Sequence, residues 1–386
     1  MQRAGLAEVL ATFGTAYLGS HELPRGAAKV WRAIVSCRTA ALGGHVESCT
    51  HCGTMRHVYH SCRNRHCPRC QTRAKESWIA ARQREVLPVP YFHLVFTLPH
   101  VLNPLIAAAP RRLYENLFAA VSATLTEFAA NPHHLGGMSA FSLILHTWKQ
   151  DLGRHVHLHA LVAGGALSEQ NAWIRPKTGF LFPVKALSKV FRGKFVAGLD
   201  GLRQTRQLPE SLTTQSDWPP LKQALYAHDW VVYAKQPLGG PEAVLEYLGR
   251  YTHRVAISNE RIVGIEGHTV HFRVRADPVS GKRRVSTLSG IEFIQRFVRH
   301  VLPSGFKRIR HYGLLSPARK KDGLTAARAA LGVPPPDSVI IESVEDFLRR
   351  VARYESMRCP RCSAGTFRVV ASLRPVRYPL NLRGPP

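Results

Sequence analysis

Hydrophobic and polar residues alternate along residues 154–162, whose sequence is Arg-His-Val-His-Leu-His-Ala-Leu-Val. Side chains of a β-strand point to opposite faces in turn, so His155, His157 and His159 share one face and the apolar residues take the other. A Gly-Gly pair at 164–165 ends the segment. We therefore predict a strand with three imidazoles on one side, where they can bind one metal ion or serve only solubility and hydrogen bonding.

The pattern around this strand predicts an α+β domain, with a central antiparallel sheet and flanking helices, preceded by a small metal-stabilised module. Apolar runs predict strands at 90–99 and 141–148, and the short connection after the second makes it an antiparallel neighbour of the histidine strand. The remaining expected elements are helices at 103–130, 186–202 and 291–301, strands at 180–183 and 230–235, a hairpin over 269–287, an irregular loop over 205–220 and a short alanine-rich helix in the tail.

Two tyrosines lie four residues apart behind a Gly-Gly-Pro helix-start signal at 239–241. On a helix, Tyr247 and Tyr251 stack on one face, one turn apart. Alone, this pair is most simply part of an amphipathic helix, since Val244 and Leu248 continue an apolar stripe at helical spacing. Beside a histidine strand, the same pair suggests phenolic nucleophiles directed at a metal-polarised phosphate.

The charge balance points to a polyanionic partner. The chain of 386 residues has 53 Lys and Arg against 25 Asp and Glu, a formal net charge of +28. Such an excess of positive charge is typical of nucleic-acid binding. A membrane surface is the competing polyanion, but the sequence has neither an apolar run of spanning length nor a signal-peptide core. We expect a cytoplasmic protein whose partner is DNA.

Two Cys-x-x-Cys turns, Cys49 with Cys52 and Cys67 with Cys70, are separated by 14 residues. Each turn presents two thiolates, so we predict one structural zinc ion bound by these four residues. The sequence leaves open whether another nearby residue replaces a ligand or helps to hold a second ion. The candidates are Cys62, His45, His57, His60 and His66. A last turn, Cys359-Pro-Arg-Cys362, is half a site: it completes an ion with the N-terminal module, forms a site with other partners, or binds nothing.

A basic loop lies beside these cysteines and contains Arg63, Arg65 and Arg69. A solvated surface is the simplest interpretation of such a loop. Next to a zinc-binding turn, we favour contact with the DNA backbone, because Arg commonly donates hydrogen bonds to phosphate oxygens.

Taken together, these motifs resemble HUH-type transposases of the two-tyrosine, rolling-circle insertion-sequence class, which have an N-terminal zinc-binding domain. The resemblance rests on the histidine strand, the Tyr-x-x-x-Tyr helix and the cysteine-rich N-terminus. It also covers three further segments: residues 61–70, 230–235 and 305–313. It therefore extends over most of the chain, and it implies an HUH endonuclease-like sheet in a bacterial, nucleoid-associated protein.

The resemblance implies a metal-dependent tyrosine DNA strand transferase that nicks and joins single-stranded DNA at element ends and target through a 5′-phosphotyrosine. Tyr251 and Tyr247 would be the paired nucleophiles, and His157 and His159 the first metal ligands, with His155 as a third. Imidazole ligands by themselves favour zinc or another late transition metal, whereas the resemblance implies Mg or Mn. Cations available to contact DNA or stabilise a phenolate are Lys235, Arg250 and Arg254, with His253 beside them.

We expect three domains: a helical and zinc-binding DNA-binding module over 1–89, a catalytic domain over 90–313, and a basic C-terminal region over 314–386. Rival functions are a plasmid rolling-circle replication initiator and a non-catalytic zinc-containing DNA-binding protein. A three-carboxylate recombinase is disfavoured because acidic residues are few, and a β/α-barrel metallohydrolase because its strand pattern is missing. The oligomeric state stays open, with a homo-oligomer among the alternatives.

Overall fold

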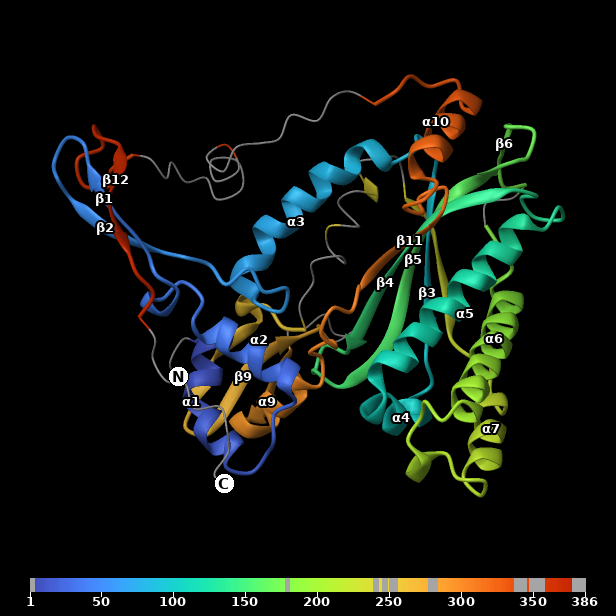
Figure 1. The fold of residues 1–386 in the computed structure, drawn as a ribbon, viewed down its shortest axis with the longest axis horizontal. Coiled ribbons are helices and arrows are strands. Elements are labelled where there is room, and N and C mark those ends of the chain that lie inside the picture. The colour runs from blue at the N-terminus through green and yellow to red at the C-terminus, as the bar shows by residue number, and fades with distance from the viewer. Residues whose placement is uncertain are drawn as a thin grey trace. The chain divides into compact units, whose positions relative to one another are not determined.

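The computed structural model describes residues 4–177, 181–238, 243–244, 249, 256–276, 284–336, 346 and 358–376. The chain divides into two compact units (Figure 1). Unit 1 contains Met1–Ala80, His253–Val301 and Ser338–Pro386, and unit 2 contains Ala81–Thr252 and Leu302–Asp337. These units do not follow the predicted boundaries at 89 and 313, because two later segments of the chain pack with the N-terminal residues.

Unit 2 is built on an antiparallel sheet in the order β11-β4-β5-β3-β7. Its strands are β3 (Tyr91–Thr97), β4 (Met138–Trp148), β5 (Arg154–Leu167), β7 (Val232–Leu238) and β11 (Ile309–Gly313), and the short β6 (Trp173–Ile174) pairs with β5. The predicted antiparallel pairing of β4 with β5 is confirmed, and it sets His146 opposite His157. The sheet and its helices confirm the α+β fold class.

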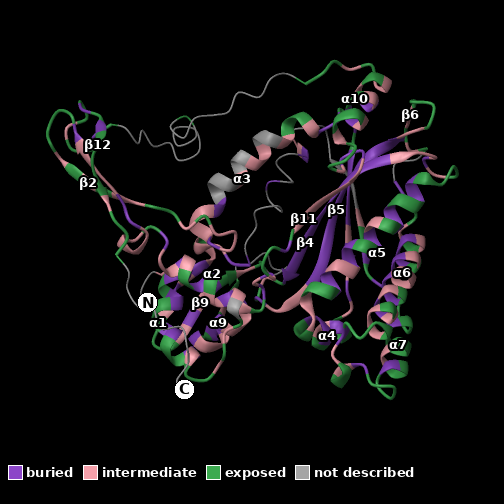
Figure 2. Ribbon diagram, in the orientation of Figure 1, coloured by how far each residue is buried: buried purple, intermediate pink, exposed green. Residues whose placement is uncertain are grey.

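The two faces of this sheet differ in chemistry. One face is apolar, with Phe96, Leu145 and Leu158 in the core, and it is covered by α5 (Pro110–Ala130) and α6 (Val184–Gln204) (Figures 1 and 2). The helix–sheet contact includes Phe191 of α6, whose ring packs edge-on against Phe96 at 5.3 Å. The opposite face carries the histidines predicted from the alternating pattern.

Further helices of unit 2 are α4 (Asn103–Ala108), α7 (Trp218–Tyr226) and α10 (Lys320–Ala330). The helix predicted over 103–130 is interrupted at Ala109, because Pro110 begins a new helix and disfavours helical backbone at the residue before it. The predicted loop over 205–220 is wrong in part, since η4 (Glu210–Leu212) and the start of α7 lie within it. The strand predicted over 180–183 is also wrong where it is described: Phe182 is buried in the helical core, edge-on to Phe128.

Unit 1 contains a three-stranded sheet of β8 (Ile262–Glu266), β9 (Thr269–Val274) and β10 (Arg284–Ser289). The predicted hairpin of β9 and β10 is confirmed, and β8 adds a strand that was not predicted. Helices α1 (Leu6–Leu18) and α2 (Arg25–Val35) pack together, and α9 (Gly290–Val298) packs on α1. A Cβ at Gly290 would lie 2.1 Å from Phe13, so only glycine allows this close approach.

A second sheet of unit 1 has the order β12-β1-β2, and it pairs strands from the N-terminal part of the chain with a strand from the C-terminal part (Figure 1). Strands β1 (Gly44–Cys49) and β2 (Met55–Tyr59) form a hairpin, and β12 (Phe367–Leu373) pairs antiparallel with β1. We call this sheet the ribbon. Helix α3 (Pro68–Arg82) follows the hairpin, and the other short helices are η1 (Ala40–Leu42), η2 (Gln83–Glu85), η3 (His100–Leu102) and η5 (Asn259–Arg261).

None of the helices in the described part of the chain is both long and apolar enough to cross a membrane.

Candidate metal centres and DNA-processing site

Three histidines on the polar face of the unit 2 sheet form a cluster. His146 lies on β4, His157 and His159 lie on β5, and their ligand atoms are all within 4.8 Å of one another. His146 and His157 are cross-strand partners, so their side chains project from the same face. All three side chains are at most 9% exposed. The sheet therefore concentrates three imidazoles at a buried point.

Hydrogen bonds at Nδ1 orient two of these rings. The Nδ1 atom of His157 lies 3.0 Å from the carbonyl oxygen of His155, which can only accept a hydrogen bond. The Nδ1 atom of His159 lies 2.8 Å from Nε2 of His93, a buried residue of β3. A proton on each Nδ1 satisfies both contacts and places the lone pair of each ring on Nε2, the atom that would bind metal.

The two Nε2 atoms of His157 and His159 lie 3.1 Å apart. Metal–nitrogen bonds of about 2.1 Å place neighbouring ligands about 3 Å apart when they meet at right angles. The observed separation therefore fits two ligands of one cation. The same distance also fits a single hydrogen bond between the rings when one Nε2 carries a proton, so the geometry permits a metal ion without requiring it.

His155 does not join this cluster. It points along the same strand face, but its Nδ1 atom lies 3.2 Å from Nε2 of His100, and the two rings meet edge to face. Burial lowers the pKa of His155, with further contributions from nearby His100 and Lys149. The third imidazole of the cluster comes instead from His146 on the neighbouring strand. The predicted ligand set is corrected accordingly.

Aromatic residues near the cluster differ in accessibility. Trp148 stacks on His146 at 4.8 Å, and Tyr233 of β7 is 52% exposed. Trp230 is buried against Phe191 and donates its indole N–H to the carbonyl of Leu225. Trp230 is thus a core residue, and Tyr233 is the better candidate for contact with a base.

The predicted nucleophiles Tyr247 and Tyr251 lie outside the described residues, as do the side chains of Arg250, His253 and Arg254. Strand β7, which precedes them in the sequence, is described, and the backbone of Lys235 pairs there with His93 on β3. The tyrosine assignments therefore remain predictions from the sequence.

The cysteines form two clusters, and these differ from the predicted zinc site. Residues Cys49 and Cys52 do not share a site with Cys67 and Cys70. The first cysteine cluster consists of Cys37, Cys62, Cys67 and Cys70, and the second cysteine cluster consists of Cys49, Cys52, Cys359 and Cys362. The β1–β2 hairpin explains the difference, because it carries Cys49 and Cys52 at its turn and leads to Cys62 and Cys67 only at its other end.

Sulfur positions in both clusters fit tetrahedral zinc. In the first, Sγ of Cys70 lies 3.6 Å from Sγ of both Cys37 and Cys62. In the second, the Cys49–Cys362 and Cys52–Cys359 sulfur distances are both 3.7 Å. Zinc–sulfur bonds of about 2.3 Å predict about 3.8 Å between ligands of a tetrahedral ion. Four sulfurs at these distances suit one structural zinc in each cluster.

The protonation chemistry of the cysteines agrees with this interpretation. A hydrogen bond from the Cys67 thiol is the largest influence that lowers the pKa of Cys62, to about 5, and the same contact raises the pKa of Cys67. Closely packed thiols therefore cannot all ionise by themselves. A divalent cation removes this conflict, because it stabilises every thiolate at once.

The other residues predicted near the zinc site have separate positions. His66 belongs to neither cluster, and its backbone N–H donates to Asn64. Arg69 pairs with Glu8 at 2.5 Å and also donates to the carbonyl of Cys37, so it has a structural role. Arg63 is exposed, and burial lowers the pKa of Arg65. Of the three arginines, Arg63 is the best placed for contact with DNA.

Comparison with known proteins finds matches to two segments of the chain. Residues 9–98 match the sequence model described as "Transposase zinc-binding domain", and residues 140–322 match the model described as "Putative transposase". The chain is 42% identical to "Putative transposase y4qJ" of Sinorhizobium fredii (strain NBRC 101917 / NGR234) over 384 residues, covering 95% of both proteins. The chain belongs to the HUH-type two-tyrosine transposase family with an N-terminal zinc-binding domain.

Further similarities are more distant. The transposase is 28% identical to "Transposase for insertion sequence element IS801" of Pseudomonas savastanoi pv. phaseolicola over 290 residues, covering 73% of this chain and 68% of the relative. A solved structure titled "Conjugative Relaxase Trwc In Complex With Orit DNA. Metal-Bound Structure" aligns with 62% of this chain and 98% of its own at 12% identity. Its TM-score of 0.24 is too low to bear on the fold.

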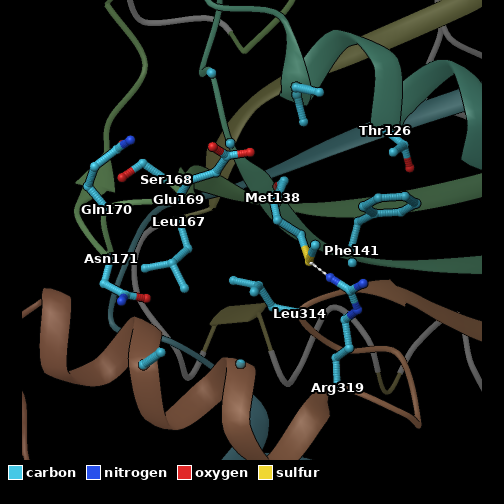
Figure 3. A pocket seen from close by; sticks show the side chains of 18 of the residues that line it. Thr126, Met138, Phe141, Leu167, Ser168, Glu169, Gln170, Asn171, Leu314 and Arg319 are labelled. Carbon is cyan, nitrogen blue, oxygen red and sulfur yellow. Dashed lines mark hydrogen bonds between the residues drawn. The ribbon is translucent and has the colours of Figure 1, made fainter.

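A cavity of about 950 Å³ in unit 2 lies apart from the histidine cluster of this transposase (Figure 3). Residues at the start of β4 and at the end of β5 line part of this cavity. The guanidinium of Arg319 contacts the sulfur of Met138 there at 3.7 Å. His146 lies eight residues further along β4, which corresponds to roughly 26 Å of strand. The cavity is therefore not part of the candidate metal centre.

Proposed function

We propose that this transposase nicks and joins single-stranded DNA at insertion-sequence ends through a 5′-phosphotyrosine intermediate, and so drives rolling-circle-type transposition. The observation that carries the proposal is the convergence of His146, His157 and His159 at one point of the sheet in a chain of this family. The excess of basic residues supports DNA as the partner.

A divalent ion bound by His146, His157 and His159 would polarise a non-bridging phosphate oxygen and neutralise its charge. The Nδ1 contacts to the carbonyl of His155 and to His93 would hold two of the ligand rings in the tautomer that binds metal. The strand pairing fixes the third ligand beside them. Little rearrangement of the protein would then be needed when metal and DNA bind.

In the proposed reaction, the phenolic oxygen of Tyr251 bonds to phosphorus and the bond from phosphorus to the 3′ oxygen breaks. The phenolic proton is balanced by the proton gained on the released 3′ hydroxyl. The ordinary pKa of tyrosine is near 10, so nearby cations must stabilise the developing phenolate. Arg250, Arg254 and Lys235 are the proposed cations. The phosphotyrosine retains the bond energy, and no external energy source is required.

Tyr247, one helical turn before Tyr251, is proposed as the second nucleophile. Two nucleophiles allow one site to cleave a donor strand and a target strand in succession. A replication initiator or a non-catalytic zinc-containing DNA-binding protein would account for fewer of the features, because neither explains the whole set of cysteine clusters, histidine cluster and paired tyrosines.

The identity of the metal is a separate part of the proposal. Family resemblance favours Mg or Mn, and a cluster of three imidazoles favours a later transition metal. Mn is compatible with both considerations, since it accepts nitrogen as well as oxygen ligands. We expect Mn to support cleavage at least as well as Mg, and cleavage assayed with each ion after removal of bound metal would test this.

The experiment uses single-stranded DNA from the flank of the element, labelled at its 3′ end, with full-length protein and Mg or Mn. A 5′-phosphotyrosine retains the labelled fragment, so a denaturing gel should show a protein–DNA adduct. The adduct should persist or weaken in either single variant, Tyr251→Phe or Tyr247→Phe, and disappear in the double variant. DNA binding without any adduct, with both flanks and both metals, would favour the binding-protein alternative.

A further inference from the structure

The second cysteine cluster joins residues from opposite ends of the chain. Cys49 and Cys362 are 313 positions apart, and Cys52 and Cys359 are 307 positions apart. All four belong to unit 1, although the sequence between them includes the whole sheet of unit 2. The match to a zinc-binding domain ends at residue 98 and therefore includes only half of this cluster.

The last strand is attached to the ribbon with little apolar burial. Backbone pairing to β1 runs from Phe367, opposite Cys49, to Leu373, opposite Gly44. Phe367 is buried, but the residues from Arg368 to Ser372 are exposed, with Val369 61% and Val370 48% accessible. Among the described residues, the local hydrophobic cluster consists of Cys49, Cys359 and Phe367, with Cys362 packed against it.

A strand with so small a core needs another source of stability, because short isolated sheets are marginal in water. Besides backbone pairing, the described contacts include the Arg56 guanidinium, 3.8 Å from the centre of the Phe367 ring. Four sulfurs at tetrahedral separations supply the missing contribution, since zinc binding to such sites is coupled to folding.

The two cysteine clusters also differ in accessibility. Cys37 and Cys67 of the first cluster are fully buried, whereas Cys52 of the second is exposed. Both Cys49 and Cys359 are buried, so the opening to solvent lies on the Cys52 side. A chelator reaches a metal ion through exposed ligands, and the second cluster should therefore lose its ion first.

We propose that the second cysteine cluster is a zinc clasp, which holds β12 against β1 and opens before the first cluster loses its metal. Residues 358–373 are then a functional part of the N-terminal module, and the ribbon is complete only when the C-terminal end of the chain is present. This proposal is independent of tyrosine chemistry at the histidine cluster.

The test uses full-length protein with a specific protease site inserted after Pro336, in the exposed Pro-Pro-Pro segment that follows α10. Metal analysis before cleavage should give two zinc ions per chain at the cysteine clusters after weakly held ions are removed. After cleavage, the C-terminal fragment should co-elute with the rest of the protein on size exclusion. A mild chelator should remove one zinc and release the fragment, and added zinc should restore the complex.

The Cys359→Ser/Cys362→Ser variant should contain one zinc and release its fragment after cleavage without chelator. Ser372→Ala, an exposed change on β12, is the matched control and should retain both zinc and fragment. Two zinc ions in the cysteine variant would overturn the proposal, as would a wild-type fragment that stays bound after its zinc is removed. If the cysteine variant fails to fold, chelation of the cleaved wild-type protein decides the question alone.

Discussion

The histidine cluster and the cysteine clusters reach similar ligand separations by opposite routes. The histidines lie on two adjacent strands, 11 positions apart between His146 and His157, and their sheet has an extensive apolar core on its other face. The second cysteine cluster gathers residues more than 300 positions apart, and Phe367 is the one other buried residue of its small apolar core in the described part of the chain. The histidine cluster is therefore preorganised by the fold, whereas we expect the fold around the cysteines to depend on the metal.

The largest expected effect is the loss of strand cleavage when the preorganised ligands are removed. His157→Ala/His159→Ala should reduce cleavage at least about 10³-fold, since a polarising ion contributes several kcal/mol to the barrier. Binding of single-stranded DNA should change little, because phosphate contacts supply most of that affinity. Adduct formation and filter binding measure the two quantities. Cleavage at the wild-type rate would exclude the histidine cluster as the catalytic metal site.

Substitution of the cysteines should have a different effect, namely a loss of folding stability. Cys67→Ser should cost the first cluster its zinc and lower the melting temperature of unit 1 by about 10 °C or more, because zinc binding and folding are coupled. Cys52→Ser, at an exposed ligand of the second cluster, should have a smaller effect. Calorimetry with zinc analysis measures both. Equal decreases in melting temperature in the two variants would show that burial does not determine how much each cluster contributes to stability.

A third prediction distinguishes the two candidates for the third histidine ligand. His146→Ala should weaken metal binding by roughly 100-fold, because a ligand to the ion is lost. His155→Ala is the matched control: it lies on the same strand face but contacts His100, and its effect should stay within about twofold. Titration of Mn into metal-free protein, followed by calorimetry, compares them. The reverse order of effects would restore His155 to the site.

Much of the site could be predicted from the sequence where donors lie within one element. Alternation placed His157 and His159 together, and the short β4–β5 connection placed β4 beside them. His146 required the register of that pairing, which a bulge between His146 and Trp148 alters, and the sequence does not specify it.

The zinc ligands were harder to predict from the sequence, because they come from segments that are far apart in the chain. Spacing identified two Cys-x-x-Cys turns, but Cys37 stands alone in the sequence and was not recognised as a ligand. The pairing of Cys49 with Cys362 depends on β12 returning to β1, a contact across most of the chain. The β1–β2 hairpin also separates the two Cys-x-x-Cys turns that the spacing assigns to one zinc ion. Local spacing does not reveal this separation.

The smallest predicted effect concerns His93, which supports the cluster without belonging to it. Its Nε2 lies 2.8 Å from Nδ1 of His159, and an acceptor at that position would keep the proton of the His159 ring on Nδ1. His93→Leu should weaken metal binding about 10-fold, the lower end of the effect expected for such a supporting contact, and should shift the His159 tautomer in nitrogen NMR spectra. His93→Gln, which retains an acceptor, should recover most of the affinity. Unchanged tautomer populations in His93→Leu would show that β-sheet packing alone orients the ring, and the preorganisation of the histidine cluster would then be steric rather than hydrogen-bonded.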